Sequence, residues 1–156
     1  MNASRKPSTA LPDEVRQTLD AVASRARGCG RFSSVEADPA GVAARPGDPE
    51  IDAAFRVDWN GVGFEVSLKT PDRWLSQSVE ATLMNTGDDL EDLIDEELVE
   101  LGCDDGPLPV KHFRDDLKQY VFVSPVPGDA AETLLACLCA YERAFSGLGD
   151  FLPHDD

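Results

Sequence analysis

Positive charge is scarce in this chain. Fourteen Lys and Arg stand against thirty Asp and Glu, which gives a net charge of −16, and only two histidines are present. A protein this acidic repels phosphate backbones and anionic lipid at ordinary salt concentrations. We therefore expect neither nucleic acid nor a membrane surface as a partner.

Long apolar runs are missing as well. No stretch approaches the roughly 20 apolar residues that a membrane span needs. The opening segment MNASRKPSTALP is basic but has no apolar stretch after it, so no secretory signal is expected. The four cysteines form no CxxC pair and are too few to staple a chain of 156 residues. These absences favour a cytoplasmic protein with reduced thiols.

Motifs that carry chemistry are also few. The histidines are His112 and His154, and no Ser or Cys lies in a recognisable nucleophile motif. Cys137 and Cys139 have the spacing of a ligand pair, but on a helix their side chains point about 160° apart. We expect a protein that is not an enzyme and has no metal site and no cofactor. An enzyme that uses carboxylates alone stays an alternative.

A hydrophobic content of 42% is enough for one folded core. The sequence predicts a disordered tail over 1–10, a single α+β domain over 11–147 and a polar tail over 148–156. Apolar residues at helical spacing predict a helix over 11–26. The segment 28–50 is rich in Gly and Pro without a sustained period, which indicates a long irregular connection.

The segment IDAAFRVDWNGVGFEVSLK alternates apolar and polar residues on both sides of Asn60 and Gly61. This dipeptide is preferred in type I′ turns, so the segment predicts a tight hairpin. A two-residue loop would place Val57 opposite Phe64 and Phe55 opposite Val66, on the face toward the helices. The other face is expected to be polar and solvated, as is typical of antiparallel sheets.

Three further regions complete the predicted order of elements. Residues 73–84 fit a helix or a strand, and the Ser, Thr and Val content favours the strand. A turn at Asp115 and Asp116 separates two strands within 108–127. A helix follows over 129–145, with Asp129 and Glu132 at capping-box spacing. The result is an α-β-β-β-α-β-β-α order with a twisted antiparallel sheet packed against helices.

The segment TGDDLEDLIDEELVELGCDDG, residues 86–106, has ten carboxylates and no Lys, Arg or His. It lacks the ligand spacing of a calcium loop, and its leucines form one helical stripe, so it predicts a helix over 88–101 with a solvated acidic face. Glu97 lies inside the apolar stripe. Its carboxylate should therefore pair with a cation, either Arg56, Lys69 or Arg114 of the same chain or a basic residue across a dimer, or reach the edge of the stripe and extend into solvent.

The chain resembles the type III secretion chaperone-like fold, including the YbjN-like bacterial proteins. The most telling segment is YVFVSPVPGDAAETLLACLCAYERAF, in which a strand ends at prolines and leads into an amphipathic last helix. The resemblance implies a small acidic homodimer without catalytic residues. Secretion chaperones bind an extended segment of another protein, so it also implies a client polypeptide.

We therefore predict a chaperone-like or adaptor protein that binds a segment of a partner polypeptide. The alternative is an acidic inhibitor, or nucleic-acid mimic, that binds a basic protein, and binding of that kind should weaken steeply with salt. The candidate contacts with a partner or a second copy are Trp74, Glu97, Val99 and Leu135.

Overall fold

A computed structural model describes residues 11–151 of the chain. This part is mixed α+β, with one six-stranded antiparallel sheet in the order β1-β2-β3-β4-β6-β5. Along the chain the elements are α1 (Asp13–Gly28), β1 (Phe32–Ala37), β2 (Gly41–Pro46), β3 (Ala54–Trp59), β4 (Phe64–Thr70), α2 (Arg73–Thr86), α3 (Leu90–Glu100), β5 (Lys111–Arg114), β6 (Tyr120–Pro125), α4 (Ala131–Ser146) and the 3₁₀ turn η2 (Gly149–Phe151).

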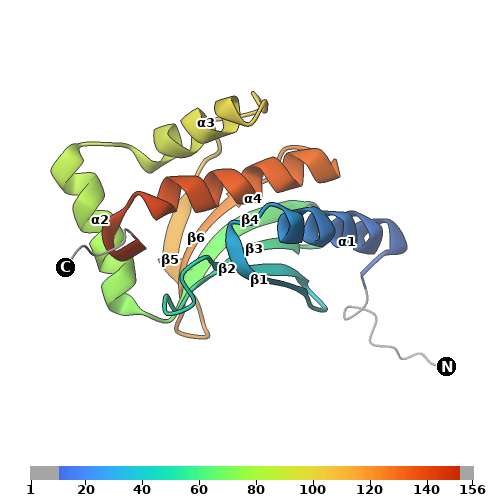
Figure 1. Ribbon diagram of the computed structural model, residues 1–156, viewed down its shortest axis with the longest axis horizontal. Helices are drawn as coiled ribbons and strands as arrows, with labels where there is room; N and C mark the ends of the chain where they lie inside the picture. Colours follow the sequence, from blue (N-terminus) through green and yellow to red (C-terminus); the bar gives the residue numbers. More distant parts are fainter. Residues whose placement is uncertain (1–10, 152–156) are drawn as a thin grey trace.

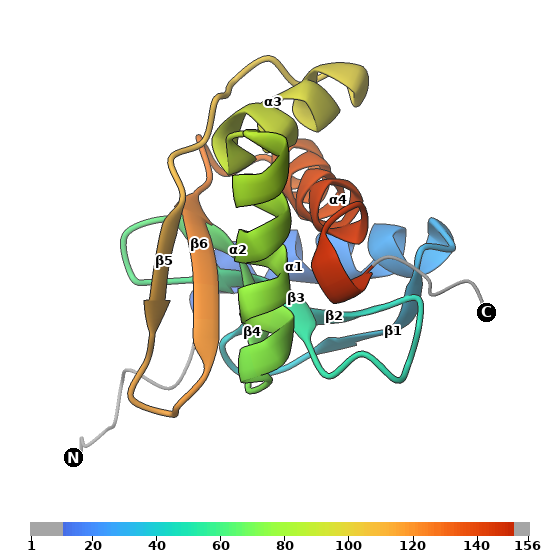
Figure 2. The same ribbon diagram turned by 90° about the vertical axis from the view of Figure 1, so that its left-hand side faces the viewer.

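The helices gather on one side of the sheet (Figure 1). Helices α1 and α4 pack on the strands, α3 packs on the outer side of α4, and α2 runs past the end of α4. Seen from that end, α2 lies in front of the other elements (Figure 2). No helix of residues 11–151 lies over the opposite face of the sheet, which is called the open face below.

The core lies between the sheet and helices α1 and α4. Alternate residues of the central strands point into it, and the rings of Phe55 and Phe122 lie 6.2 and 5.1 Å from that of Phe145 on α4. Burying each such side chain stabilises the fold by about 1.5–3 kcal/mol. Tyr141 is also buried there, and its hydroxyl lies 2.5 Å from the Ser124 hydroxyl.

Two predicted elements are wrong. Residues 73–84 form helix α2 rather than a strand, because the Asp72 side chain accepts hydrogen bonds from the amides of Trp74 and Leu75 and caps the first turn. Residues 28–50 are not an irregular connection, since they contain the paired strands β1 and β2. The sheet therefore has one strand more than predicted, and α2 is a separate helix before the predicted acidic helix, which is α3.

The β3–β4 hairpin is confirmed, but its predicted register is wrong by two residues. Val57 pairs with Val66 and Phe55 with Leu68, because the connection spans residues 60–63 instead of two residues. The Asn60 side chain accepts hydrogen bonds from the amides of Val62 and Gly63, which closes this longer turn. A shift of two keeps each side chain on its predicted face.

The last helix ends at Ser146 with Gly147 as its C-cap, as predicted, but its start and the boundary of the packed region differ from the prediction. Ala130 occupies the N-cap position of α4 and no side chain caps this end, so Asp129 and Glu132 do not form the predicted capping box. Leu148 and Phe151 are buried against the core, so the packed region extends past the predicted boundary at residue 147. The predicted tail over 1–10, and residues 152–156 of the second tail, lie outside the described residues.

Candidate functional site

The open face of the sheet is organised in rows that follow from the strand register. One row runs from Ala54 through Lys69 and Val121 to Phe113, crossing β3, β4, β6 and β5. The next row contains Ala43, Arg56, Ser67, Val123 and Lys111. The polar groups therefore lie mainly on β3 and β4, and the apolar groups lie on β6 and β5.

Arg56 is the centre of the polar part. Its guanidinium donates hydrogen bonds to both oxygens of Asp58 at 2.8–3.2 Å and to Asp38 Oδ1 at 3.0 Å. Burial by itself lowers the pKa of Arg56, but the bonds and charges of the two carboxylates outweigh it and raise that pKa. This group is a fixed ion-pair network in which one guanidinium bonds to two carboxylates, so the arginine is fully paired and one negative charge remains in excess.

Asp38 is held from two directions. Its Oδ1 accepts the amides of Ala40 and Gly41, each at 2.9 Å, in the turn between β1 and β2. Partial burial by itself raises the pKa of the Asp38 carboxyl, but the bonds from Arg56 and from these amides outweigh it, so the pKa lies below its usual value. The β1–β2 turn is thereby tied to the middle of the open face.

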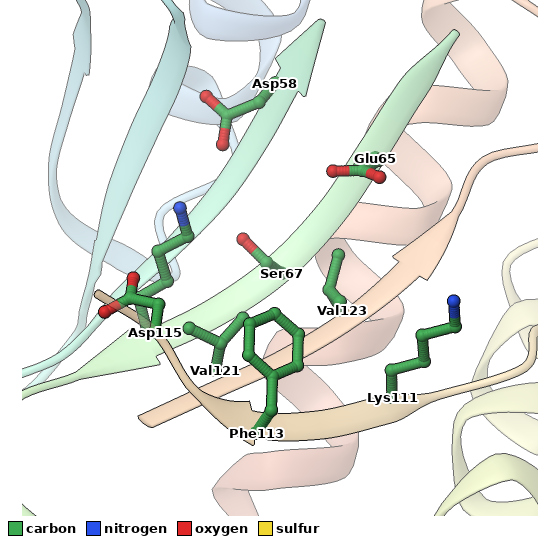
Figure 3. Close-up of a pocket in the computed structure, with 9 residues that line it drawn as sticks. Asp58, Glu65, Ser67, Lys111, Phe113, Asp115, Val121 and Val123 are labelled. Carbon is green, nitrogen blue, oxygen red and sulfur yellow. The ribbon is translucent and has the colours of Figure 1, made fainter. Parts of the chain in front are cut away.

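Beside this network the open face has a hollow of about 350 Å³ (Figure 3). The ring of Phe113 stands beside Val121 and Val123, with Asp58 and Glu65 at the far end. Phe113 is 46% exposed, which is a large apolar exposure for a sheet residue. The hollow is lined by Asp58, Glu65, Ser67, Lys69, Lys111, Phe113, Asp115, Val121 and Val123.

The charged groups around the hollow differ in whether they have hydrogen-bond or ion-pair partners within the chain. Glu65 accepts a hydrogen bond from the Asn60 side chain, and Asp115 accepts the amides of its own turn. Lys69 and Lys111 form no ion pair with any residue from 11 to 151. The ammonium groups of these two lysines are therefore not compensated by any carboxylate of the described residues, although the chain has a large excess of acids.

The two edge strands of the sheet, β1 and β5, differ in whether side chains bond to their backbone groups. At the β1 edge, Arg27 and Arg16 of α1 donate hydrogen bonds to the carbonyls of Val35 and Asp38, at 3.0 and 3.1 Å. Within the described residues, no side chain makes such a bond to a backbone group of β5. The β1 edge is therefore partly covered, whereas the β5 residues themselves have no such cover; just before β5, the amide of Val110 donates to Glu91 Oε2 at 2.9 Å.

The hydrogen bond in the turn after β5 shows which backbone groups of this strand point away from the sheet. The Asp115 amide donates to the Gln119 carbonyl at 2.9 Å, so this pair is a hydrogen-bonded one. Hydrogen-bonded and non-bonded pairs alternate in an antiparallel ladder. Lys111 and Phe113 consequently bond to β6, while the N–H and C=O groups of His112 and Arg114 face outward.

His112 joins β5 to α2 on the other face of the sheet. Its Nε2 lies 3.1 Å from Ser76 Oγ, its Nδ1 lies 3.0 Å from Glu80 Oε2, and its ring stacks on Phe122 at 3.8 Å. This is the hydrogen-bond order of a Ser-His-acid triad. However, Ser76 is only 3% exposed. The arrangement ties an edge strand to a helix.

A second hollow, of about 410 Å³, lies near the start of β1 and the end of α4. Arg31 and Glu142 line it, and the guanidinium donates hydrogen bonds to both Glu142 oxygens. These bonds raise the pKa of Arg31. The two charges satisfy each other, so the other charged group that lines this hollow is the carboxylate of Asp48, which has no ion-pair partner among residues 11–151.

The four predicted contact residues are not brought together in one site. Trp74 lies on the outer side of α2 and is 71% exposed, and Val99 is exposed on α3. Leu135 of α4 packs partly against the core. Glu97 lies 3.8 Å from Arg143 of α4, a cation that the sequence interpretation did not consider. The half-exposed Glu97 is therefore paired within its own chain, by a residue other than the three predicted.

Sequence reasoning missed the open-face hollow and the contacts of His112. Ser76 and Glu80 share a face on a strand as well as on a helix, but they lie about 13 Å apart along a strand and only about 6 Å apart along a helix. The strand prediction for 73–84 therefore placed them too far apart to bond to one imidazole. Phe113 and Val121 were assigned to strands without a register. The Asp115 turn and the alternation of 111–114 could have indicated the register.

No group of three or more His, Cys, Asp or Glu within residues 11–151 is placed to hold a metal ion. No helix in the same part of the chain is long and apolar enough to cross a membrane. Comparison of the chain with protein-family models, with curated proteins and with solved structures gives no match. The resemblance to the secretion chaperone-like fold therefore stays a prediction.

Proposed function

We propose that this protein is a non-enzymatic binding module, chaperone-like or an adaptor, that holds an extended segment of a partner polypeptide at the β5 side of its open face. The observation that carries the proposal is the hollow around Phe113 beside the β5 edge of the sheet. Extended segments bind such edges through main-chain hydrogen bonds, and pockets for alternate side chains select the sequence.

The available groups suit an extended segment with mixed side chains. The outward backbone groups of His112 and Arg114 can pair with a strand. Apolar side chains of the segment can pack on Phe113 and Val121, while Lys111 can meet an acidic side chain. The net charge of −16 makes a strongly acidic partner unfavourable as a whole.

The alternative function, binding a basic protein through the acidic surface, has its own support. Asp92, Glu96 and Glu100 are exposed on α3 and take part in no ion pair among residues 11–151. Binding of this kind depends on exposed charges and weakens as salt screens them. Binding by apolar and main-chain contacts persists at high salt, so salt separates the two functions.

A homodimer and a cytoplasmic location complete the proposal. The described cysteines are all free thiols, which is compatible with a reducing compartment. The dimer needs a surface of its own, because the inner side of α3 packs on α4 within one chain.

The test first uses tagged full-length protein to find partners and then measures the binding of defined peptides from them. Proteins retained from a lysate at about 0.1 and about 0.5 M NaCl are identified, and overlapping synthetic peptides covering them are titrated by fluorescence anisotropy. We expect one peptide whose affinity is kept at high salt and falls at least about tenfold in Phe113→Asp. Leu117→Asp is the matched control, because Leu117 is exposed in the neighbouring turn and lies outside the hollow.

Two results would overturn the proposal. One is a peptide that binds wild type and Phe113→Asp equally. The other is retention only at low salt that is lost when Asp92, Glu96 and Glu100 are replaced by their amides, which would establish the acidic surface as the binding site.

A further inference from the structure

The open-face side chains along β5 form an ordered row of three different kinds. Lys111 is a cation, Phe113 is apolar, and Asp115, which follows the strand, is an anion. Figure 3 shows the three side chains in this order along one side of the hollow that they line. Because the two charges lie at opposite ends with a ring between them, the row has a direction as well as a composition.

Both charged groups of the row are uncompensated within the described part of the chain. Neither Lys111 nor Asp115 forms an ion pair with any residue from 11 to 151. Asp115 Oδ1 accepts the amides of Leu117 and Gln119, each at 2.9 Å. These bonds hold the carboxylate at the end of the strand and leave its charge without a cation.

The backbone of β5 limits where a second strand can pair. Every second residue points its backbone groups outward, and the first such amide, that of Val110, already donates to Glu91 Oε2 at 2.9 Å. Pairing therefore begins at His112 and continues at Arg114. A residue opposite Phe113 then belongs to a non-hydrogen-bonded pair, in which the side chains are closest, with Cβ atoms about 4.5–5.5 Å apart.

An antiparallel strand fits this edge better than a parallel one. Every pairing in the sheet is antiparallel, and antiparallel pairing is slightly more stable per residue. An incoming antiparallel strand passes Asp115 first, then Phe113 and then Lys111, at alternate residues. Opposite charges across such a pair stabilise it, and like charges destabilise it. The complementary segment therefore reads basic-x-apolar-x-acidic from its N-terminal end.

We propose that the segment held at β5 is antiparallel and has this pattern, with its base opposite Asp115, its apolar residue opposite Phe113 and its acid opposite Lys111. The inference rests on the proposed function, because it names the kind of segment that the same site takes. A base and an acid cancel, so the net charge of −16 neither attracts nor repels the pattern as a whole. The order of the charges then selects between segments of the same composition.

The test compares two blocked peptides of identical composition, SGTKTVTETGS and SGTETVTKTGS, which differ only in the order of their charges. Each is titrated to about 2 mM into the ¹⁵N-labelled full chain, at about 0.05 and about 0.5 M NaCl, and the amide chemical shifts are followed. We expect the first peptide to shift the amides of His112 and Arg114. It should bind at least about fivefold more tightly than the second at low salt, and the difference should narrow at high salt.

Reversing one charge of the protein isolates the pair at Lys111. In Lys111→Glu the first peptide should bind about fivefold more weakly, because its acid then meets a like charge. A third peptide, SGTKTVTKTGS, has a base in place of that acid and should bind this variant better than it binds wild type. Lys118→Glu is the matched control, because it makes the same charge change at an exposed position in the turn, outside the row. Circular dichroism checks that both variants fold.

Equal binding of the first two peptides would overturn the inference, and so would tighter binding of the second, which would indicate a parallel strand. Absence of any shift of the β5 amides would also overturn it. None of these results decides the proposed function, which partner peptides and Phe113→Asp test separately.

A second copy of the chain is the competing occupant of this edge, because residues 111–115, KHFRD, themselves have the basic-x-apolar-x-acidic order. Sedimentation velocity of the chain without peptide distinguishes the two occupants. We expect no self-association that depends on Lys111. A dimer that is weakened by Lys111→Glu and not by Lys118→Glu would assign the edge to the second copy and overturn the inference.

Discussion

Gly41 lies directly opposite Asp58 in the pairing of β2 with β3, and there is no room between them for a side chain. A β-carbon at Gly41 would come within 2.1 Å of the Val57 carbonyl oxygen and 2.5 Å of Asp58 Oδ1. The close approach lets the Asp58 carboxylate stay in its bonds with Arg56. The first prediction follows from this contact.

Gly41→Ala should lower the free energy of unfolding by about 1–3 kcal/mol, because the backbone or Asp58 must move. Gly63→Ala is the control, since a β-carbon at Gly63 meets no atom within 4 Å. Urea unfolding followed by circular dichroism measures both. Equal midpoints for the two variants would mean that the strands separate at little cost.

Asp38 should stabilise the fold in a pH-dependent way. Its pKa is lower in the folded chain than in the unfolded one, so its contribution is full above the unfolded value of about 3.9 and is lost as pH falls through the lowered pKa. Asp38→Asn should therefore destabilise the protein by about 0.5–1 kcal/mol at neutral pH and by less below about pH 4.

Asp48 provides the matched control for this experiment. Asp48 is also followed by Pro and also accepts the amide two residues on, but no arginine pairs with it. Asp48→Asn therefore removes a carboxylate from the same kind of turn without removing an arginine contact. A parallel pH dependence in the two variants would show that Arg56 contributes nothing to the behaviour of Asp38.

The sequence predicted most of this fold because burial patterns over 11–26, 54–70 and 129–145 are strong. The wrongly predicted elements, α2 and the strands β1 and β2, are those whose apolar pattern does not decide between helix, strand and loop. Leu75 and Val79 fit a strand or a helix, and the deciding features were the caps, Asp72 before α2 and Gly87 after it with a φ of 76°. The strands β1 and β2 were missed because Gly41, Ala43 and Ala44 bury little apolar area and give no clear alternation.

The candidate site was harder to predict than the elements. Its hollow depends on β5 and β6, which are far apart in the sequence from β4, and on the position of Phe113 beside Val121. The charge pattern of the sequence indicated the acidic helix α3 as a candidate contact surface instead. The pairing of Glu97 with Arg143 requires the packing of α3 on α4, which the pattern of one helix does not specify.

The four thiols should differ widely in reactivity. Burial, with smaller contributions from nearby charged groups, raises the pKa of Cys137 to about 12 and that of Cys139 to about 11, whereas Cys29 is exposed. The thiolate is the reactive form, so iodoacetamide at about pH 8 should modify Cys29 first and Cys137 only on unfolding. Mass spectrometry of timed digests measures the order. Early modification of Cys137 in folded protein would contradict its burial in the core.

The last prediction concerns the role of His112, whose partners could be taken for a catalytic triad. If the cluster only holds β5 against α2, a fluorophosphonate probe should leave Ser76 unmodified, because this hydroxyl is buried. His112→Ala should instead raise the hydrogen exchange of the β5 amides, by about threefold or more, because the strand loses its bonds to Ser76 and Glu80. Arg114→Ala is the control on the same strand and face, where the guanidinium only lies over the Tyr120 ring. Probe labelling that disappears in Ser76→Ala would reverse this assignment, since a reactive Ser76 requires both an open path and an activated hydroxyl.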